Sequence, residues 1–555
     1  MNSIAEKRII ILDGAMGSII QVLNLDEKSY RGGLFADHPI PLVGCNDLLC
    51  LTRPGAIGAI HDTYLEAGAD IIETCSFNST SVTLSDYGLA NYSYEISAAA
   101  ARIAKKSADK FSSYGKPRFV AGSIGPTAKG ASLYPDINNP GKRSIVWDEL
   151  ESAYYDNARG LLDGGADIFL VETIFDTLNA KAAIHAITRL LEERQIDVPV
   201  IISAAISGES ERLLSGQNLE AFIISVLHVK PWAIGLNCSF NAPKLLPYVR
   251  SLSKIVPCLV SAYPNAGLPN KFGRYEEMPN VMADNMEQFF SEGLVNIIGG
   301  CCGSTPAHIA AIADKAQNYL PRKISNQHVK KFYNGFSGLE PFYADNKTVP
   351  LINTESSVDE DQFKKALADG EYEDAADIAR DIIENGSAIL NIEITDKNNI
   401  NEKAINSFLD YALMNPYIAK APFFINSLDQ SVLIAGLKRI QGRGFAGPVN
   451  LKNGEKEFLY KIHIIQRYGA AAVVTLIDEQ ENNSSLNADG TDIIKRKIEI
   501  SGRIFKLLQE TGYPVQNIVF APNMTENGPS SVSTADSETV CSWIRDNCPG
   551  ALIAL

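Results

Sequence analysis

Three cysteines of this chain are placed so that they could bind one metal ion together. Cys301 and Cys302 are adjacent and have glycine on both sides. Glycine lets the backbone turn sharply, so both thiols can point into one space. Cys238 also follows a glycine-containing segment, and both cysteine segments come directly after a predicted strand. We therefore expect the three thiols to converge at one end of a sheet.

Three thiolates with one open position are typical of a catalytic zinc site. Soft sulfur ligands favour zinc over calcium or magnesium. The open position could take a substrate thiol, whose thiolate is the reactive form, and zinc would keep that thiol deprotonated. Such chemistry needs no nucleophile from the protein. The alternative interpretation is a set of buried cysteines without a metal.

Polar residues stand at the ends of four predicted strands. They are Asp13, Glu73, Ser123 and Glu172. Each carboxylate alone could simply cap a following helix. Several of them on one rim indicate a polar pocket, in which carboxylates can hold an ammonium group and the backbone N–H groups of a glycine turn can hold a carboxylate. An amino-acid substrate carries both groups.

Eight short apolar runs alternate with segments of helical periodicity in the first 320 residues. This order predicts a closed (β/α)₈ TIM barrel, with an open doubly wound sheet as the alternative. No G-x-G-x-x-G follows the first run, which disfavours a dinucleotide-binding fold. The predicted strands are 9–12, 71–73, 119–122, 168–171, 200–203, 233–236, 258–261 and 295–298.

A second α/β domain is predicted after a polar, Pro- and Gly-containing break at 321–350. This domain is short for eight βα units, so we expect a second, incomplete TIM barrel. The predicted domains are 1–323 and 346–555, with a linker at 324–345. We expect strands at 389–392, 423–425, 472–477 and 518–521, an interrupted strand at 551–555, and helices at 363–385, 401–413, 456–468 and 493–511. The polar loops 482–490 and 523–533 are predicted to be flexible.

The composition is that of an ordinary globular protein. The 555 residues carry a formal net charge of −15, which argues against a nucleic-acid partner. No apolar segment has the roughly 20 residues that span a bilayer, and the charged N-terminus is unlike a signal peptide. We therefore expect a cytoplasmic protein without membrane contact, whose nine cysteines are not paired as disulfides.

Residues 1–320 closely resemble the homocysteine-binding barrel of cobalamin-dependent methionine synthases. The matching segments are 12–17, 69–74, 122–127, 214–218, 235–239, 263–267 and 299–303. The resemblance implies that Cys238, Cys301 and Cys302 bind zinc, that Asp13 and Glu172 hold the amino group of homocysteine, and that backbone near Ala15 takes its carboxylate. Ser123 belongs to the same predicted substrate site. Cys75 stands where the family usually has Asn, and we expect it to alter the pocket rim.

Residues 346–555 resemble the next module of that family, the barrel that binds methyltetrahydrofolate. The residues that hold the pterin differ, however. The family's Asp-Ile-Asn is Asn391-Ile392-Glu393, and the aspartates of its later strands are replaced by Asn426 and Ala521. A carboxylate accepts hydrogen bonds from the N–H groups of a pterin. Each N–H group that loses its acceptor weakens binding by about 1–3 kcal/mol. We therefore predict a degenerate barrel that does not bind methyltetrahydrofolate.

The cobalamin-binding signature Asp-x-His-x-x-Gly does not occur in the chain. The predicted function is zinc-dependent methylation of homocysteine to methionine, with methylcobalamin supplied by a separate corrinoid protein. Two alternatives remain open. The methyl donor could be a sulfonium compound, a betaine or methyltetrahydrofolate, or the chain could be a non-catalytic binding or scaffold protein with a relic zinc site.

Overall fold

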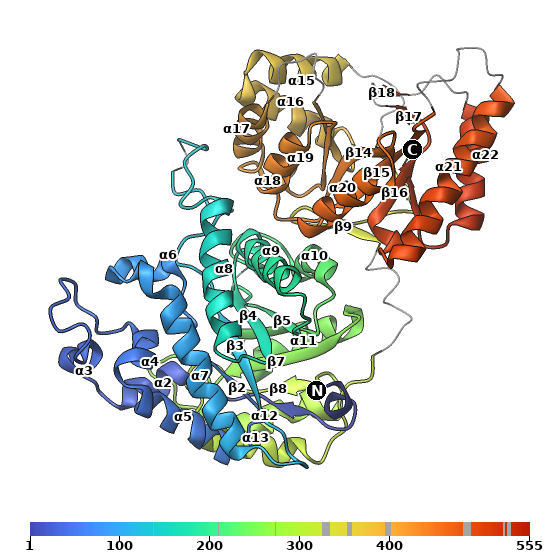
Figure 1. Ribbon diagram of the computed structural model, residues 1–555. Coiled ribbons are helices and arrows are strands. Elements are labelled where there is room, and N and C mark those ends of the chain that lie inside the picture. Colours follow the sequence, from blue (N-terminus) through green and yellow to red (C-terminus); the bar gives the residue numbers. More distant parts are fainter. Residues whose placement is uncertain are drawn as a thin grey trace. The chain divides into compact units, whose positions relative to one another are not determined.

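The computed structural model (Figure 1) forms two compact units. The first comprises 1–133, 144–219 and 230–329, and the second comprises 134–143, 220–229 and 330–555. The structure describes residues 1–136, 138–208, 210–271, 273–324, 334–351, 358–394, 401–480, 490–525, 528–529 and 534–554.

The first unit is a closed barrel of eight parallel strands, as the sequence predicts. Around the barrel the order is β1-β8-β7-β6-β5-β4-β3-β2, and a parallel bridge between Leu12 and Ile71 joins the first and second strands. The strands are β1 (Ile10–Ile11), β2 (Ile71–Glu73), β3 (Phe119–Ile124), β4 (Ile168–Ile174), β5 (Val200–Ala204), β6 (Ala233–Asn241), β7 (Leu259–Asn265) and β8 (Ile297–Ile298).

Helices connect these strands, and the long helices α7, α8 and α9 lie beside one another on the outside of the barrel (Figure 1). In chain order the helices are α1 (Asn2–Ala5), α2 (Met16–Val22), α3 (Glu27–Arg31), α4 (Leu49–Thr52), α5 (Pro54–Glu66), α6 (Ser81–Leu84), α7 (Ser93–Phe111), α8 (Trp147–Asp163), α9 (Thr177–Arg194), α10 (Leu219–Val226), α11 (Ala242–Ile255), α12 (Pro279–Ser291) and α13 (Pro306–Ala316).

The interior of the first barrel has an apolar core and a polar layer at the carboxyl ends of its strands. Its apolar core includes Ile71, Ala121, Leu170 and Ile201. Side chains alternate between the two faces of a strand, so the residue two positions further along points the same way. Those positions are Glu73, Ser123, Glu172 and Ser203. A polar layer therefore closes the core at the carboxyl ends of the strands, where TIM-barrel active sites lie.

The second unit contains a parallel sheet of seven strands in the order β11-β19-β16-β15-β14-β13-β12. The strands are β11 (Thr348–Val349), β12 (Leu390–Ile394), β13 (Phe423–Ser427), β14 (Phe445–Leu451), β15 (Ala471–Asp478), β16 (Ile518–Ala521) and β19 (Leu552–Ala554). Two antiparallel pairs accompany the sheet, namely β9 (Gly335–Ser337) with β10 (Pro341–Tyr343) and β17 (Met524–Thr525) with β18 (Gly528–Pro529). Seven parallel strands with connecting helices confirm a second barrel-like domain.

The helices of the second unit are α15 (Val358–Asp369), α16 (Tyr372–Glu384), α17 (Glu402–Ala412), α18 (Pro416–Ala419), α19 (Gln430–Leu437), α20 (Glu455–Arg467), α21 (Gly490–Thr511) and α22 (Thr534–Asn547). The predicted single helix 363–385 is wrong, because Gly370 adopts a left-handed φ of +81° and divides α15 from α16. Strand β14 was not predicted, because its Gly447-Pro448 pair is typical of a turn. The polar loop predicted at 482–490 lies almost wholly outside the described residues, and that at 523–533 lies partly outside them.

Arg443 holds the β9–β10 hairpin against the sheet of the second unit. Its guanidinium is buried and donates to the backbone oxygen of Gly335 at 3.1 Å and to Oδ1 of Asn517 at 2.8 Å. It also stacks over the ring of Phe336, 5.0 Å from the centroid. Arg443 therefore has a structural role in the second unit.

A buried histidine on α5 should make the first unit sensitive to acid. His61 is fully buried, neither ring nitrogen has a partner among the described residues, and burial lowers its pKa to about 4. The unfolded chain therefore takes up a proton below about pH 6.5, which the folded chain refuses until about pH 4. The free energy of unfolding therefore falls as the pH is lowered through that window, by about 2 kcal/mol between pH 7 and pH 5.

We expect His61→Leu to remove this loss, as measured by urea unfolding at both pH values. His38→Gln is the control, because His38 is only half-buried and its Nε2 lies 2.7 Å from the backbone oxygen of Tyr87. An unchanged pH dependence in the His61 variant would show that other groups cause the acid sensitivity.

Candidate active site

Three thiols meet at the carboxyl end of the first barrel. The sulfur atoms of Cys238, Cys301 and Cys302 all lie within 4.8 Å of one another, and those of Cys238 and Cys302 are 3.4 Å apart. Among the described residues, no other group of three or more Cys, His, Asp or Glu side chains converges in this way. Hydrogen bonds from the other two thiols lower the pKa of Cys302. The same contacts and burial raise the pKa values of Cys238 and Cys301. Three sulfur donors suit a soft divalent cation, which would stabilise the thiolate form of all three.

Backbone hydrogen bonds fix the segment that carries Cys301 and Cys302. The amide of Gly300 donates to the backbone oxygen of Asp13 at 3.1 Å, and the amide of Cys301 donates to that of Pro264 at 2.8 Å. The carbonyl of Cys302 accepts from the amide of Ala266 at 2.9 Å. The two thiols are thus held between the loops that follow β1 and β7.

Close packing explains the glycines of this segment. A Cβ atom on Gly300 would lie 2.5 Å from Oγ of Ser304, which bonds the carbonyl of Cys301 at 2.6 Å. Gly303 has a left-handed φ of +82°, and a Cβ there would lie 2.2 Å from Cβ of Tyr275. Side chains at these positions would displace the cysteines.

Two residues of the site adopt backbone conformations that non-glycine residues rarely take. Cys238 and Thr173 both have φ of +53°. Each follows an inward-facing polar residue of its strand, Asn237 on β6 and Glu172 on β4. Such strain costs on the order of 1–3 kcal/mol and is typical of functional sites. The amide of Asn265 supports the unusual turn by donating to the backbone oxygen of Cys238 at 3.0 Å.

Glu172 lies in a hydrogen-bonded network of inward-facing side chains. Its Oε1 accepts from the hydroxyl of Ser123 at 2.5 Å, and its Oε2 lies 3.4 Å from Nδ2 of Asn237. Oδ1 of Asn237 in turn accepts from the hydroxyl of Ser203 at 2.8 Å and from the amide of Thr173 at 3.1 Å. The network fixes the carboxylate of Glu172 next to the part of β6 that carries Cys238.

Three acidic side chains share this polar layer. Asp13 accepts from the amide of Glu73 at 3.0 Å through Oδ2, while its buried Oδ1 has no hydrogen-bond partner. Burial and the repulsion by Glu172 raise the pKa values of Asp13 and Glu73, and burial raises the pKa of Glu172 to about 7. Within the described ranges no basic side chain forms an ion pair with any of the three. A cationic ligand would therefore satisfy the layer.

The first turn of α2 lies beside the cysteine loop. Ala15 is the N-cap of this helix, and its own amide already donates to Oγ of Ser304 at 3.1 Å. The next amides, those of Met16 and Gly17, belong to a first helical turn, where N–H groups have no partner within the helix. The anion-binding groups near Ala15 are thus those of the residues that follow it.

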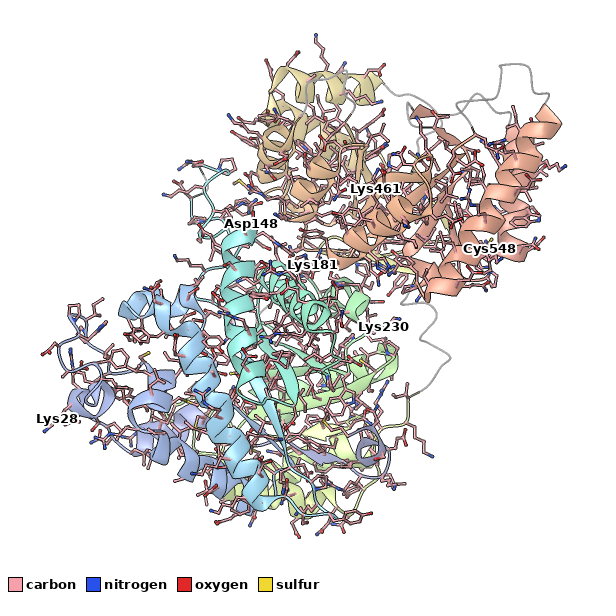
Figure 2. All side chains as sticks on the ribbon, in the orientation of Figure 1. Lys28, Asp148, Lys181, Lys230, Lys461 and Cys548 are labelled. Carbon is pink, nitrogen blue, oxygen red and sulfur yellow. The ribbon has the colours of Figure 1, made fainter. Side chains whose placement is uncertain are left out.

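The other cysteines lie apart from the cluster. Sγ of Cys75 is 3.7 Å from the backbone oxygen of Asn46 and 3.9 Å from Oδ1 of Asp47, so it packs into the wall behind the rim. Cys548, labelled in Figure 2, is buried just after α22 in the second unit. The remaining cysteines, Cys45, Cys50, Cys258 and Cys541, are free, and all but Cys258 are buried.

Sequence reasoning did not assign Asn237 and Tyr275 to the site. Asn237 stands two residues after Gly235 on β6, which places it on the inner face of the barrel. The Tyr275 hydroxyl lies close enough to Cys302 to help lower the pKa of that thiol. Tyr275 follows no strand directly, so no local pattern pointed to it.

In the second unit, the three altered pterin positions lie on the inner face of the sheet. Ala521 belongs to the apolar core, and Asn391 and Asn426 stand two residues after its members Ile389 and Phe424. Oδ1 of Asn391 is buried without a hydrogen-bond partner.

Glu393, the neighbour of Asn426 in the strand register, is engaged at the same end of the sheet. It forms an ion pair with Lys364 at 2.7 Å. A charged side chain in this place is therefore already neutralised within the unit.

Comparison with known proteins agrees with this division. Residues 357–538 match the model of the pterin binding enzyme family, and residues 10–316 match that of the homocysteine S-methyltransferase family. Among solved structures, the metallated homocysteine methyltransferase MmuM from Escherichia coli is 23% identical, with 57% of this chain and 98% of that chain covered and a TM-score of 0.44. Its oxidized form is also 23% identical, with 55% and 96% covered and a TM-score of 0.43. Because the first family model spans more than half of its residues, the chain belongs to the homocysteine S-methyltransferase family.

Proposed function

We propose that this protein methylates the thiol of homocysteine, with zinc at Cys238, Cys301 and Cys302, to form methionine. The convergence of the three sulfur atoms beside a buried acidic layer carries this proposal. The three sulfur atoms suit a metal that activates a thiol, and the acidic layer suits an α-ammonium group. The family match supports the same substrate.

The residues present fit a zinc ion. Three thiolates would be its protein ligands, which leaves one position for a substrate. When bound, zinc supplies Lewis-acid activation that keeps a substrate thiol deprotonated near neutral pH. The chain's own contribution is to hold the three sulfurs in place through the glycine turns and the hydrogen bond from Asn265.

The acidic layer would orient the amino acid. Asp13 and Glu172 would hold the ammonium group, with Ser123 and Asn237 fixing the carboxylate of Glu172. The first-turn amides after Ala15 would take the substrate carboxylate. Three points of attachment, thiol, ammonium and carboxylate, position the reacting sulfur and exclude water from it.

We infer that the methyl donor is methylcobalamin carried by a separate corrinoid protein. The resemblance of the first barrel to cobalamin-dependent methionine synthases favours this donor. The presence of a second, pterin-binding-type unit also favours it over small sulfonium or betaine donors, since enzymes that use small donors need only the first barrel.

Product analysis tests the proposed reaction. Zinc-loaded protein should form methionine from homocysteine with free methylcobalamin, as followed by mass spectrometry. If methionine forms with S-methylmethionine or betaine but not with methylcobalamin, the proposed methyl donor is wrong and the proposed methylation of homocysteine stands. No product with any of these donors would favour the scaffold interpretation with a relic zinc site.

We propose that the second unit does not bind methyltetrahydrofolate. Asn391 and Asn426 provide mixed donor and acceptor groups where the family has carboxylates, and Ala521 provides neither. Glu393, at a further altered position, is already neutralised by its ion pair with Lys364. The unit would instead dock the corrinoid protein.

A binding experiment checks this loss. Titration of the intact chain with methyltetrahydrofolate should give a Kd weaker than about 100 μM, because three unpaired donors at about 1–3 kcal/mol each reduce a micromolar affinity by at least about a hundredfold. The double variant Asn391→Asp, Asn426→Asp is the matched comparison and should bind no less tightly than the natural chain. Micromolar binding by the natural chain would show that the pterin site is intact.

A further inference from the structure

The acidic layer of the first barrel contains one more carboxyl group, that of Glu73, than the two proposed ammonium ligands. Asp13, Glu73 and Glu172 are all enclosed by the barrel, and each repels another. No Lys or Arg within the described ranges forms an ion pair with any of these carboxyl groups. Burial and mutual repulsion raise their pKa values, so the free protein favours their protonated form, whereas a cationic ligand would favour the ionised form.

Glu73 faces the same space as Glu172. It follows the core residue Ile71 by two positions on β2, and its register partner on β3 is Ala121, another core residue. Parallel register partners point to the same side of a sheet, so Glu73 points inward. Its amide donates to Oδ2 of Asp13, which ties the two acidic residues together at adjoining strand ends.

The side chain of Glu73 is also available. It is partly accessible, unlike Asp13 and Glu172, which are 2% and 4% exposed. No hydrogen bond or ion pair of its carboxylate occurs in the described part of the chain. Beside it, Oδ1 of Asp13 is buried and equally without a partner. Two unpaired acceptor groups from neighbouring strands thus face one enclosed space.

We propose that Glu73 is a third ligand of the substrate ammonium and makes the site selective for thiols that carry a free amino group. This inference rests on the proposed homocysteine site. An ammonium group has three N–H donors, which matches the three carboxylates Asp13, Glu73 and Glu172. A thiol without the amino group would leave all three carboxylates without a counter-charge.

The test compares two ligands and two substitutions. 4-Mercaptobutanoate has the thiol, chain length and carboxylate of homocysteine but lacks its amino group. Glu73→Gln keeps the shape of the side chain and removes its charge. Glu66→Gln, at an exposed position of α5, is the matched control. Affinities are measured by calorimetry on zinc-loaded full-length protein, and kcat and KM are measured with methylcobalamin.

Glu73→Gln should weaken homocysteine binding by about tenfold or more, because charge-assisted hydrogen bonds are among the stronger ones. The affinity for 4-mercaptobutanoate should change by less than about twofold, and KM for homocysteine should rise while kcat holds. Glu66→Gln should change neither ligand. Equal weakening of both ligands, or no weakening of homocysteine, would overturn the proposal.

Two additions keep the outcome readable. If Glu73→Gln does not fold, Glu73→Asp retains the charge on a shorter side chain and should weaken homocysteine alone by a few fold. An equal effect on both ligands would again contradict the proposal. If the natural protein binds homocysteine but forms no methionine, the proposed reaction fails, while the calorimetric comparison still decides the role of Glu73.

Discussion

Cys301→Ser is expected to abolish both zinc retention and methionine formation. A serine hydroxyl is a poor ligand for zinc at neutral pH, and the remaining two thiols cannot hold the ion firmly. Loss of the activated thiol is worth several kcal/mol, so kcat/KM should fall by about a thousandfold or more. The measurements are zinc content after dialysis and the rate of product formation.

Cys258→Ser is the control for this experiment. Cys258 lies just before β7 and outside the three-thiol cluster, so its replacement should leave zinc content and activity near those of the natural protein. Retention of stoichiometric zinc by Cys301→Ser would show that the ion is held elsewhere. Full activity of the zinc-free variant would refute metal activation.

Glu172→Gln should lower kcat/KM for homocysteine by about a hundredfold, which corresponds to about 3 kcal/mol. The change removes a charge from the ammonium site and presents an amide group to Nδ2 of Asn237 and to the hydroxyl of Ser123. Zinc content should not change, because Glu172 lies in the layer below the thiols. Steady-state kinetics and zinc analysis check both expectations.

Glu149→Gln on the exposed side of α8 is the matched control, and it should behave as the natural protein. An undiminished kcat/KM in Glu172→Gln would remove Glu172 from the substrate site. A parallel loss of zinc would instead indicate that the substitution disrupts the barrel end as a whole.

The sequence predicts the first barrel well because its strands are buried on both faces and appear as short apolar runs between helices. Each predicted run overlaps an observed strand, for example 168–171 with β4 and 200–203 with β5. The second unit is harder to predict. Strand β14 contains Gly447-Pro448, and the left-handed Gly370 interrupts a continuous helical pattern. A Gly-Pro pair inside a strand depends on its tertiary context, whereas Gly370 is a local helix-ending signal that the helical periodicity on both sides outweighed.

The site was predicted only in part, for a related physical reason. Cysteine chemistry is specific enough that three cysteines after strands pointed to one cluster. A strand-end carboxylate such as Glu73 is ambiguous, because it caps a helix as readily as it binds a ligand. Its inward direction follows from strand register and from the neighbouring core residues, which emerge only with the fold. The inward direction of Asn237, the residue before Cys238, likewise follows only from the fold.

No helix in the described parts of the chain is long and apolar enough to cross a membrane. This finding agrees with the absence of long apolar runs from the sequence.

X-ray absorption at the zinc edge tests the central claim most directly. Zinc-loaded protein should show three sulfur neighbours, one from each of Cys238, Cys301 and Cys302. Addition of homocysteine should increase this number to four, because the substrate thiol takes the open position, whereas addition of methionine should not. A first shell with fewer than three sulfurs, or one that homocysteine leaves unchanged, would contradict the account.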